Sequence, residues 1–152
     1  MKFEEIIISE ILKIRELGID ELEQAYPVIH QLRTHLSLEE YISHVKAMIP
    51  YGYQVVCLFE GDNVVTYAGF AEQLNMYYGN HIWVYDLVTD NEKQGNGYGK
   101  ILLSHIERLA KDNSLSCVAL SSGIQREDAH RFYEKGMGYN KTGYVFNKNM
   151  KK

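Results

Sequence analysis

The segment Gln94-Gly95-Asn96-Gly97-Tyr98-Gly99-Lys100 carries the strongest chemical signal in the chain. Glycine lets a backbone approach a ligand closely and leaves amide N–H groups directed outward. An apolar helical stripe begins directly after this segment, and the start of a helix adds partial positive charge. We therefore expect the loop to bind an anion such as a phosphate or a pyrophosphate, with a purely structural glycine-rich loop as the alternative.

Two common phosphate-binding motifs do not fit the loop. A Walker A loop ending at Gly99-Lys100 would need glycine at position 94 and Ser or Thr at position 101, but the chain has Gln94 and Ile101. A dinucleotide fingerprint beginning at Gly95 would need glycine at position 100, and it belongs to the first βαβ unit of a fold. A third pattern, Gln/Arg-x-x-Gly-x-Gly/Ala between a strand and a helix, is met by Gln94, Gly97 and Gly99.

A second motif, Ala129-His130-Arg131-Phe132-Tyr133, lies on a helix predicted over 127–136. Together the two motifs resemble the GCN5-related N-acetyltransferase (GNAT) superfamily. The glycine loop is similar to the acetyl-CoA pyrophosphate motif of that family, and Ala129-x-x-Phe132-Tyr133 is similar to its next motif. The order of elements agrees from about Ser9 to Asn147.

The resemblance implies where acetyl-CoA, the cosubstrate, would bind. The pantetheine arm would follow the strand at Leu87, Val88 and Thr89, and Gln94 would brace the loop. Arg126 stands where the family often has Asn, so Arg126 or His130 could reach phosphate instead. Tyr133 matches the family tyrosine that commonly protonates the departing CoA thiolate. The pyrophosphate would lie on the amides of Gly95, Asn96, Gly97, Tyr98, Gly99 and Lys100.

Acetyl transfer to an amine also needs the amine in its neutral form. Deprotonating an alkylamine with a pKa of about 10.4 at pH 7 costs roughly 4–5 kcal/mol, so we expect a base. Asp86 and Glu72 are the acids to consider, acting directly or through water. Strand alternation turns Asp86 away from the face of Trp83 and Tyr85 unless a bulge intervenes. A structural hydrogen bond at Asp86 and a solvated rim position at Glu72 are the alternatives.

The acceptor pocket is expected to involve His30, near the predicted substrate helices, and the strand residues Trp83 and Tyr85. Aromatic rings can stack on a cation, although rings on strands are often simply half-buried sheet. No two histidines have the His-x-x-x-His spacing, so we expect no metal site.

The fold must bring these motifs together. The length of the chain and the order of its expected elements predict a single acetyltransferase domain over residues 1–152, of the α/β (α+β) class. The resemblance implies a mixed, largely antiparallel sheet of six to seven strands, flanked by about four helices and splayed at the acetyl-CoA site. Helices are expected after Asp20, with Pro27 splitting the first one, after Ser37, over 98–110 and over 127–136. Strands are expected over 9–17, 54–60, 64–71, 81–88, 117–120 and 139–147.

The composition excludes several classes of protein. Sixteen Lys and Arg against 20 Asp and Glu give a net charge of -4, which disfavours a nucleic-acid binder. A hydrophobic content of 45% excludes a disordered chain. The first residues are acidic where a signal peptide is basic, and Ile6-Ile7-Ile8 is too short to span a membrane. We therefore expect a cytoplasmic protein without a membrane partner.

Taken together, these features predict an acetyl-CoA-dependent N-acetyltransferase. The acetyl group would pass directly, in a ternary complex, to a primary amine of a small molecule or a peptide. One alternative is a catalytically silent module that binds acetyl-CoA as a sensor or scaffold, and another is a nucleotide-binding protein unrelated to CoA. The Tyr-rich strands could also form a homodimer interface.

Overall fold

The computed structural model describes residues 1–151 and divides the chain into two compact units, Met1–Ala119 and Leu120–Lys152. We describe each unit by itself. The organisation of the whole chain as one domain stays a prediction. Within residues 1–151, no helix has both the length and the apolar character needed to cross a bilayer.

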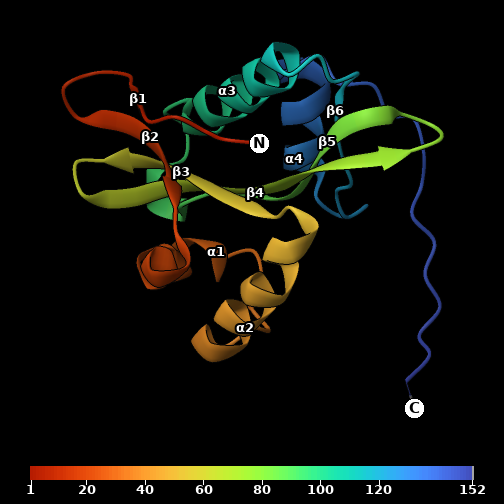
Figure 1. Cartoon of the computed structure of the whole chain (residues 1–152), viewed down its shortest axis with the longest axis horizontal. Coiled ribbons are helices and arrows are strands. Elements are labelled where there is room, and N and C mark those ends of the chain that lie inside the picture. The colour runs from red at the N-terminus through yellow and green to blue at the C-terminus, as the bar shows by residue number, and fades with distance from the viewer. Residues whose placement is uncertain (152) are drawn as a thin grey trace. The chain divides into compact units, whose positions relative to one another are not determined.

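The first unit is built on an open sheet with the strand order β1-β2-β3-β4-β5-β6. The first five strands pair antiparallel with one another in this order, so the predicted α/β class and largely antiparallel sheet are confirmed (Figure 1). The strands are β1 (Ile6–Ile7), β2 (Leu12–Leu17), β3 (Gln54–Glu60), β4 (Asn63–Asn75), β5 (Gly79–Thr89) and β6 (Val118–Leu120).

Helices lie on both faces of this sheet (Figure 1). On one face, the 3-10 helix η1 (Ile19–Ala25) leads into α1 (Tyr26–Ile29), and Pro27 in the first turn of α1 separates the two as predicted. On the same face α2 (Leu38–Met48) begins at the predicted capping box, in which Ser37 and Glu40 each bond the backbone N–H of the other. The opposite face carries α3 (Tyr98–Asp112), which packs on β3, β4 and β5.

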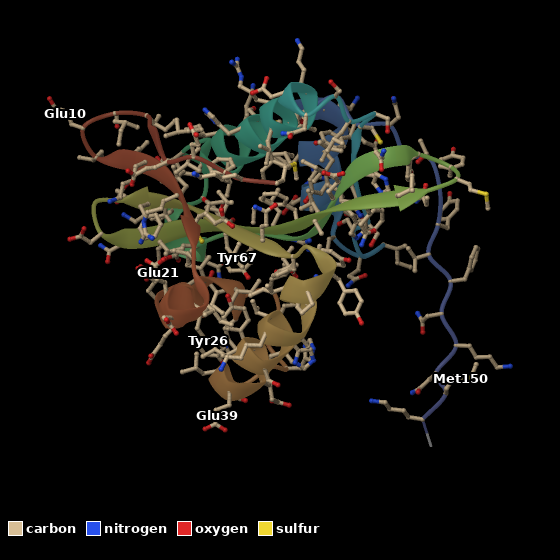
Figure 2. All side chains as sticks on the ribbon, viewed as in Figure 1. Glu10, Glu21, Tyr26, Glu39, Tyr67 and Met150 are labelled. Atoms are coloured by element: carbon tan, nitrogen blue, oxygen red, sulfur yellow. The ribbon has the colours of Figure 1, made fainter. Side chains whose placement is uncertain are left out.

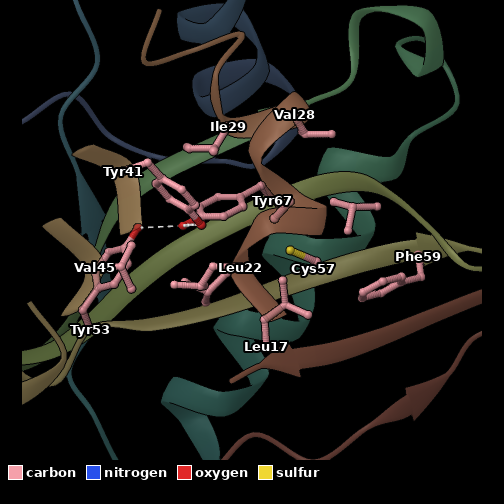
Figure 3. Packing of buried hydrophobic residues seen from close by; sticks show 13 residues of the cluster. Leu17, Leu22, Val28, Ile29, Tyr41, Val45, Tyr53, Cys57, Phe59 and Tyr67 are labelled. Carbon is pink, nitrogen blue, oxygen red and sulfur yellow. Dashed lines mark hydrogen bonds between the residues drawn. The ribbon is translucent and has the colours of Figure 1, made fainter. Parts of the chain in front are cut away.

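The helices η1, α1 and α2 share one hydrophobic cluster with the sheet (Figure 3). Leu22 and Ile29 point into it from the helical side, and Cys57 and Tyr67 come from the strands. All four side chains are almost fully buried, which fixes the helices against β3 and β4. Two short 3-10 turns, η2 (Ile49–Tyr51) and η3 (Asn91–Lys93), complete the first unit.

The second unit contains α4 (Glu127–Arg131), which continues as a π-helical turn, η4 (Phe132–Gly136). The strand predicted over 139–147 is wrong, because this segment has no strand pairing. Its residues Tyr144, Val145 and Phe146 are exposed. Aromatic and β-branched residues favour an extended backbone, but a strand also needs a partner edge, which local sequence does not provide.

Candidate functional site

A β-bulge in β5 decides which side chains meet at the site. Gly69 of β4 pairs with Asp86, but the next residue, Phe70, pairs with Val84, so Tyr85 has no partner opposite it. An extra residue of this kind shifts the alternation of a strand. Tyr85 and Asp86 consequently line the same cavity, although they are consecutive. By strand alternation, Asp86 could share a face with Tyr85 only if a bulge intervened, and this bulge is present.

The cavity lies on the face of the sheet that carries α1 and α2. Its volume is about 290 Å³, near the lower end of the roughly 300–1,000 Å³ typical of small-ligand pockets. Most of the lining is apolar, and Asp86 is its one acidic residue. The lining consists of Ile29, Arg33, His35, Leu36, Tyr41, His44, Val45, Met48, Tyr53, Tyr85 and Asp86.

Both oxygens of the Asp86 carboxylate have a donor. Arg33 Nε donates to Oδ1 at 2.8 Å, and the Tyr53 hydroxyl donates to Oδ2 at 2.7 Å. Arg33 Nη2 also donates to the Tyr85 carbonyl at 2.9 Å, which ties the guanidinium to the bulge itself. The Asp86 side chain is 12% exposed and that of Arg33 is 41% exposed. Asp86 is thus a partly buried carboxylate held in one orientation.

A chain of tyrosine hydroxyls continues from Asp86 into the core. Tyr53 and Tyr67 share a hydrogen bond of 3.2 Å, and Tyr41 donates to Tyr67 at 3.0 Å. The hydroxyls of Tyr53 and Tyr67 face each other in Figure 3, and Tyr67 is placed between the sheet and the helices in Figure 2. Burial, and then the charge of Asp86, raises the pKa of Tyr53 well above its usual value of 10.0. Tyr53 therefore stays a neutral donor to Asp86.

Two residues of the glycine loop have left-handed backbone conformations. Gly95 has φ of +86° and Gly97 has φ of +76°, in the left-handed region that favours glycine. Gly97 is the N-cap of α3, and the first-turn amides of the helix have no acceptor within the helix. The Asn96 side chain donates to the Lys93 carbonyl at 2.9 Å, and Gln94 donates to Asn91 at 3.3 Å. This geometry suits a phosphate-sized anion.

Glu60, at the end of β3, holds both ends of the loop. Lys93 Nζ lies 2.7 Å from one carboxylate oxygen, and the Tyr98 hydroxyl donates to the other at 2.6 Å. The bond from Lys93, followed by that from Tyr98, lowers the pKa of Glu60. The loop is thereby fixed to the sheet through Tyr98 and two residues that the sequence did not single out, Glu60 and Lys93.

The strand residues expected along the pantetheine arm lie in the second half of β5. Leu87, Val88 and Thr89 pair with β4 and are half-buried. The described backbone bonds between β5 and the residues leading into β6 join Ser116 to Asn80 and Ile82 to Cys117. These two bonds lead into the pairing of β5 with β6, which are hydrogen-bonded neighbours in the sheet.

The second unit holds the remaining predicted residues. Tyr133 is buried, and this burial raises the pKa of its phenol above the usual 10.0. His130 Nε2 bonds the Gly123 carbonyl at 2.8 Å, and Arg126 is the N-cap of α4. The imidazole of His130 thus has a structural contact inside its own unit.

Three predicted residues lie outside the cavity lining. Glu72 is exposed and pairs with Ile82, His30 caps α1 beside the Tyr26 ring, and Trp83 packs near His81. Sequence reasoning missed Arg33 and Tyr53, which hold Asp86. The helical stripe of Tyr41, Val45 and Met48 signalled only that α2 has a buried face. Among the described residues, no three His, Cys, Asp or Glu side chains are grouped as a metal site would require.

Comparison with known proteins identifies the family of the chain. The model of the acetyltransferase (GNAT) family matches residues 17–139. The chain is 36% identical over 130 residues to a Bacillus subtilis (strain 168) protein described as the uncharacterized N-acetyltransferase YhdJ, covering 85% of this chain and 92% of that one.

Solved structures share the fold. A GNAT family acetyltransferase from Staphylococcus aureus subsp. aureus USA300_TCH1516 superposes with a TM-score of 0.74 at 17% identity, over 92% of this chain and 99% of that one. An aminoglycoside acetyltransferase, meta-AAC0020, from an uncultured soil metagenomic sample in complex with sisomicin gives 0.78 at 17% identity, over 95% and 100%. The resemblance inferred from the two sequence motifs is therefore confirmed: the chain belongs to the acetyltransferase (GNAT) family and is an acetyltransferase.

Proposed function

We propose that the chain is an acetyl-CoA-dependent N-acetyltransferase that acetylates a primary amine by direct transfer in a ternary complex. The observation that carries the proposal is the glycine loop, in which two left-handed glycines precede α3. Such a loop offers backbone amides and the positive end of a helix to a pyrophosphate. The family match over residues 17–139 includes parts of both units, which supports one catalytic domain.

The cofactor would bind along residues of β5, the loop and α4. Its pyrophosphate would lie on the amides of the segment 95–100, braced by Gln94, and its pantetheine arm would follow Leu87, Val88 and Thr89. Arg126 and His130 would contribute from the second unit. When bound, acetyl-CoA supplies the activated thioester.

The amine would attack the thioester carbonyl from the cavity beside Asp86. A C–N bond forms and the C–S bond breaks, so the products are an N-acetylated amine and CoA. The amine loses a proton to a base, and we favour Asp86 over Glu72 because Asp86 lines the cavity, with a water between the two groups where needed. Tyr133, which burial keeps protonated, would return a proton to the departing thiolate.

A thermal-shift titration tests the cofactor assignment. Acetyl-CoA, CoA, ATP and NAD are titrated into the wild type, Gly97→Glu and the control Gly61→Glu. Gly61 also has a positive φ but lies in the β3–β4 turn, with nothing within 4 Å of an added Cβ. A ligand at 100 times its Kd should add about 2.7 kcal/mol of stability. We expect acetyl-CoA and CoA alone to stabilise the wild type and the control.

Two results would contradict the proposal in different ways. Stabilisation by ATP or NAD in preference to CoA would assign the loop to another cofactor. Stabilisation by CoA without thiol release from acetyl-CoA, across a broad panel of primary amines, would favour a silent binding module. Loss of CoA binding in Gly97→Glu counts only if circular dichroism shows that this variant folds.

A further inference from the structure

The polar groups of the acceptor cavity form a dipolar pair rather than an acidic patch. The Arg33 guanidinium and the Asp86 carboxylate lie 2.8 Å apart, and both line the cavity. Their formal charges cancel. His35 and His44, which also line the cavity, are exposed and add no negative charge.

Both Arg33 and Asp86 can form further hydrogen bonds. A guanidinium carries five N–H donors, and Arg33 uses one on Asp86 and one on the Tyr85 carbonyl. A carboxylate has about four acceptor positions, and Asp86 fills two of them with Arg33 and Tyr53. The Arg33 side chain is 41% exposed, so its remaining donors can be reached from the cavity.

Such a pair is complementary to a zwitterion. An α-amino acid carries an ammonium and a carboxylate on one carbon, so the ammonium can face Asp86 while the carboxylate faces Arg33. Arginine binds a carboxylate through two parallel N–H bonds, which gives both charge and orientation. The ammonium would then lie beside the group that we propose as the base.

The rest of the cavity is suited to an apolar side chain. Ile29, Leu36, Val45 and Met48 supply aliphatic and thioether surface, and the rings of Tyr41 and Tyr85 complete it. A volume of about 290 Å³ leaves room for one side chain of the size of methionine or phenylalanine. A polycationic acceptor would bring several charges to a lining with a single carboxylate that is already paired.

We propose that the acceptor is a free α-amino acid with an apolar side chain, bound through its carboxylate to Arg33 and through its amine to Asp86. Arg33 is then a specificity-determining residue. The inference rests on the proposed N-acetyltransferase function and adds the class of acceptor to it.

The test compares each amino acid with the amine that lacks only its carboxylate. Thiol release from acetyl-CoA is measured with L-methionine against 3-(methylthio)propylamine, with L-phenylalanine against 2-phenylethylamine, and with spermidine as the polycation. We expect wild-type kcat/KM to be roughly 10- to 100-fold higher for each amino acid than for its matched amine, as the loss of a charged hydrogen-bond partner predicts.

Arg33→Gln should remove most of that ratio, chiefly by raising KM for the amino acids. Arg33→Lys keeps the positive charge but loses the two parallel N–H donors. This variant should leave an intermediate ratio of kcat/KM between each amino acid and its matched amine. Arg15→Gln is the matched control, because Arg15 pairs with Glu21 and lies outside the cavity lining. It should keep the wild-type ratio.

Several outcomes would overturn the inference. Matched amines or spermidine used as well as the amino acids would remove the carboxylate from recognition. An equal fall for amino acids and amines in Arg33→Gln would mean that Arg33 acts only by holding Asp86. If no compound is acetylated while acetyl-CoA still stabilises the fold, the acceptor class is wrong but the cofactor site stands. If acetyl-CoA does not bind, the proposed function itself fails.

Discussion

The hydroxyl of Tyr53 lies directly against Gly69, where an added Cβ would come within 1.8 Å of the Tyr53 oxygen. Gly69 also pairs with Asp86 in the β4–β5 register, and Tyr53 donates to Asp86 from this position. The missing side chain at position 69 is therefore what allows a tyrosine from another element to reach the carboxylate across the sheet.

Gly69→Ala should displace the Tyr53 ring and break its bond to Asp86. Overpacking of this kind in a buried site typically costs about 1–3 kcal/mol, and the stability loss would be measured by urea unfolding. We also expect kcat/KM for the amine to fall while the Kd of acetyl-CoA stays unchanged. Gly143→Ala is the control, because nothing lies within 4 Å of a Cβ there. Wild-type stability in Gly69→Ala would disprove this packing.

Tyr53→Phe should remove a donor from Asp86 without changing the ring volume. The variant leaves Asp86 and Tyr67 short of one partner each, so unfolding free energy should drop by about 1–2 kcal/mol. Turnover should fall by about tenfold, since Asp86 loses its fixed orientation. Tyr51→Phe, at an 83% exposed tyrosine nearby, should match the wild type in both measurements. Equal behaviour of the two variants would argue against a positioning role for Tyr53.

Glu60→Gln should weaken acetyl-CoA binding, because Lys93 and Tyr98 would lose the charge that holds both ends of the loop. The pKa of Glu60 is lowered below its usual 4.5, so its stabilising effect is complete above that pH. It is lost as the pH falls through the lowered folded-state pKa. Acetyl-CoA titrations at neutral pH and urea unfolding from neutral pH down to about pH 3 would measure both effects.

The free energy of unfolding should be higher for the wild type than for Glu60→Gln at neutral pH, and this gap should disappear in acid. Glu10→Gln, on an exposed bend, should show neither the gap nor weaker binding. A gap that widens in acid would contradict the assigned direction of the pKa shift.

Tyr133→Phe should lower turnover by about 10²-fold or more while leaving the Kd of acetyl-CoA within a factor of two. Burial raises the pKa of Tyr133 above 10.0, so the phenol remains an acid through the neutral range. Single-turnover thiol release would separate this step from product release. Tyr144→Phe, at an exposed position, is the control. Unchanged turnover in Tyr133→Phe would remove this residue from the mechanism.

Local signals account for most of the fold that the sequence predicted. A continuous apolar run located β3 to the residue, the capping box located the start of α2, and Pro27 marked the break between η1 and α1. β1 was missed because two residues are too few for a periodic pattern. The segment 139–147 shows the opposite error, in which a suitable local pattern lacks strand pairing.

The residues of the site also divide into those that local sequence predicts and those that it does not. The glycine loop was recognisable because its chemistry lies in one contiguous segment. The groups that hold Asp86 and the loop are distant in sequence: Arg33 is 53 positions from Asp86, and Glu60 is 38 positions from Tyr98. Such contacts depend on the register between strands and on the packing of helices, so spacing alone does not reveal them.

The extra residue at Tyr85 makes the count of residues in β5 as important as their identity. Because Tyr85 is unpaired, Val84 and Asp86 lie opposite the consecutive residues Phe70 and Gly69, and Tyr85 shares a face with Asp86. Deleting Tyr85 would remove one wall of the cavity and the bulge, but it would leave Asp86 opposite Gly69. An alignment that ignores the bulge and counts strict alternation from Val84 would instead place the carboxylate on the wrong side of the sheet.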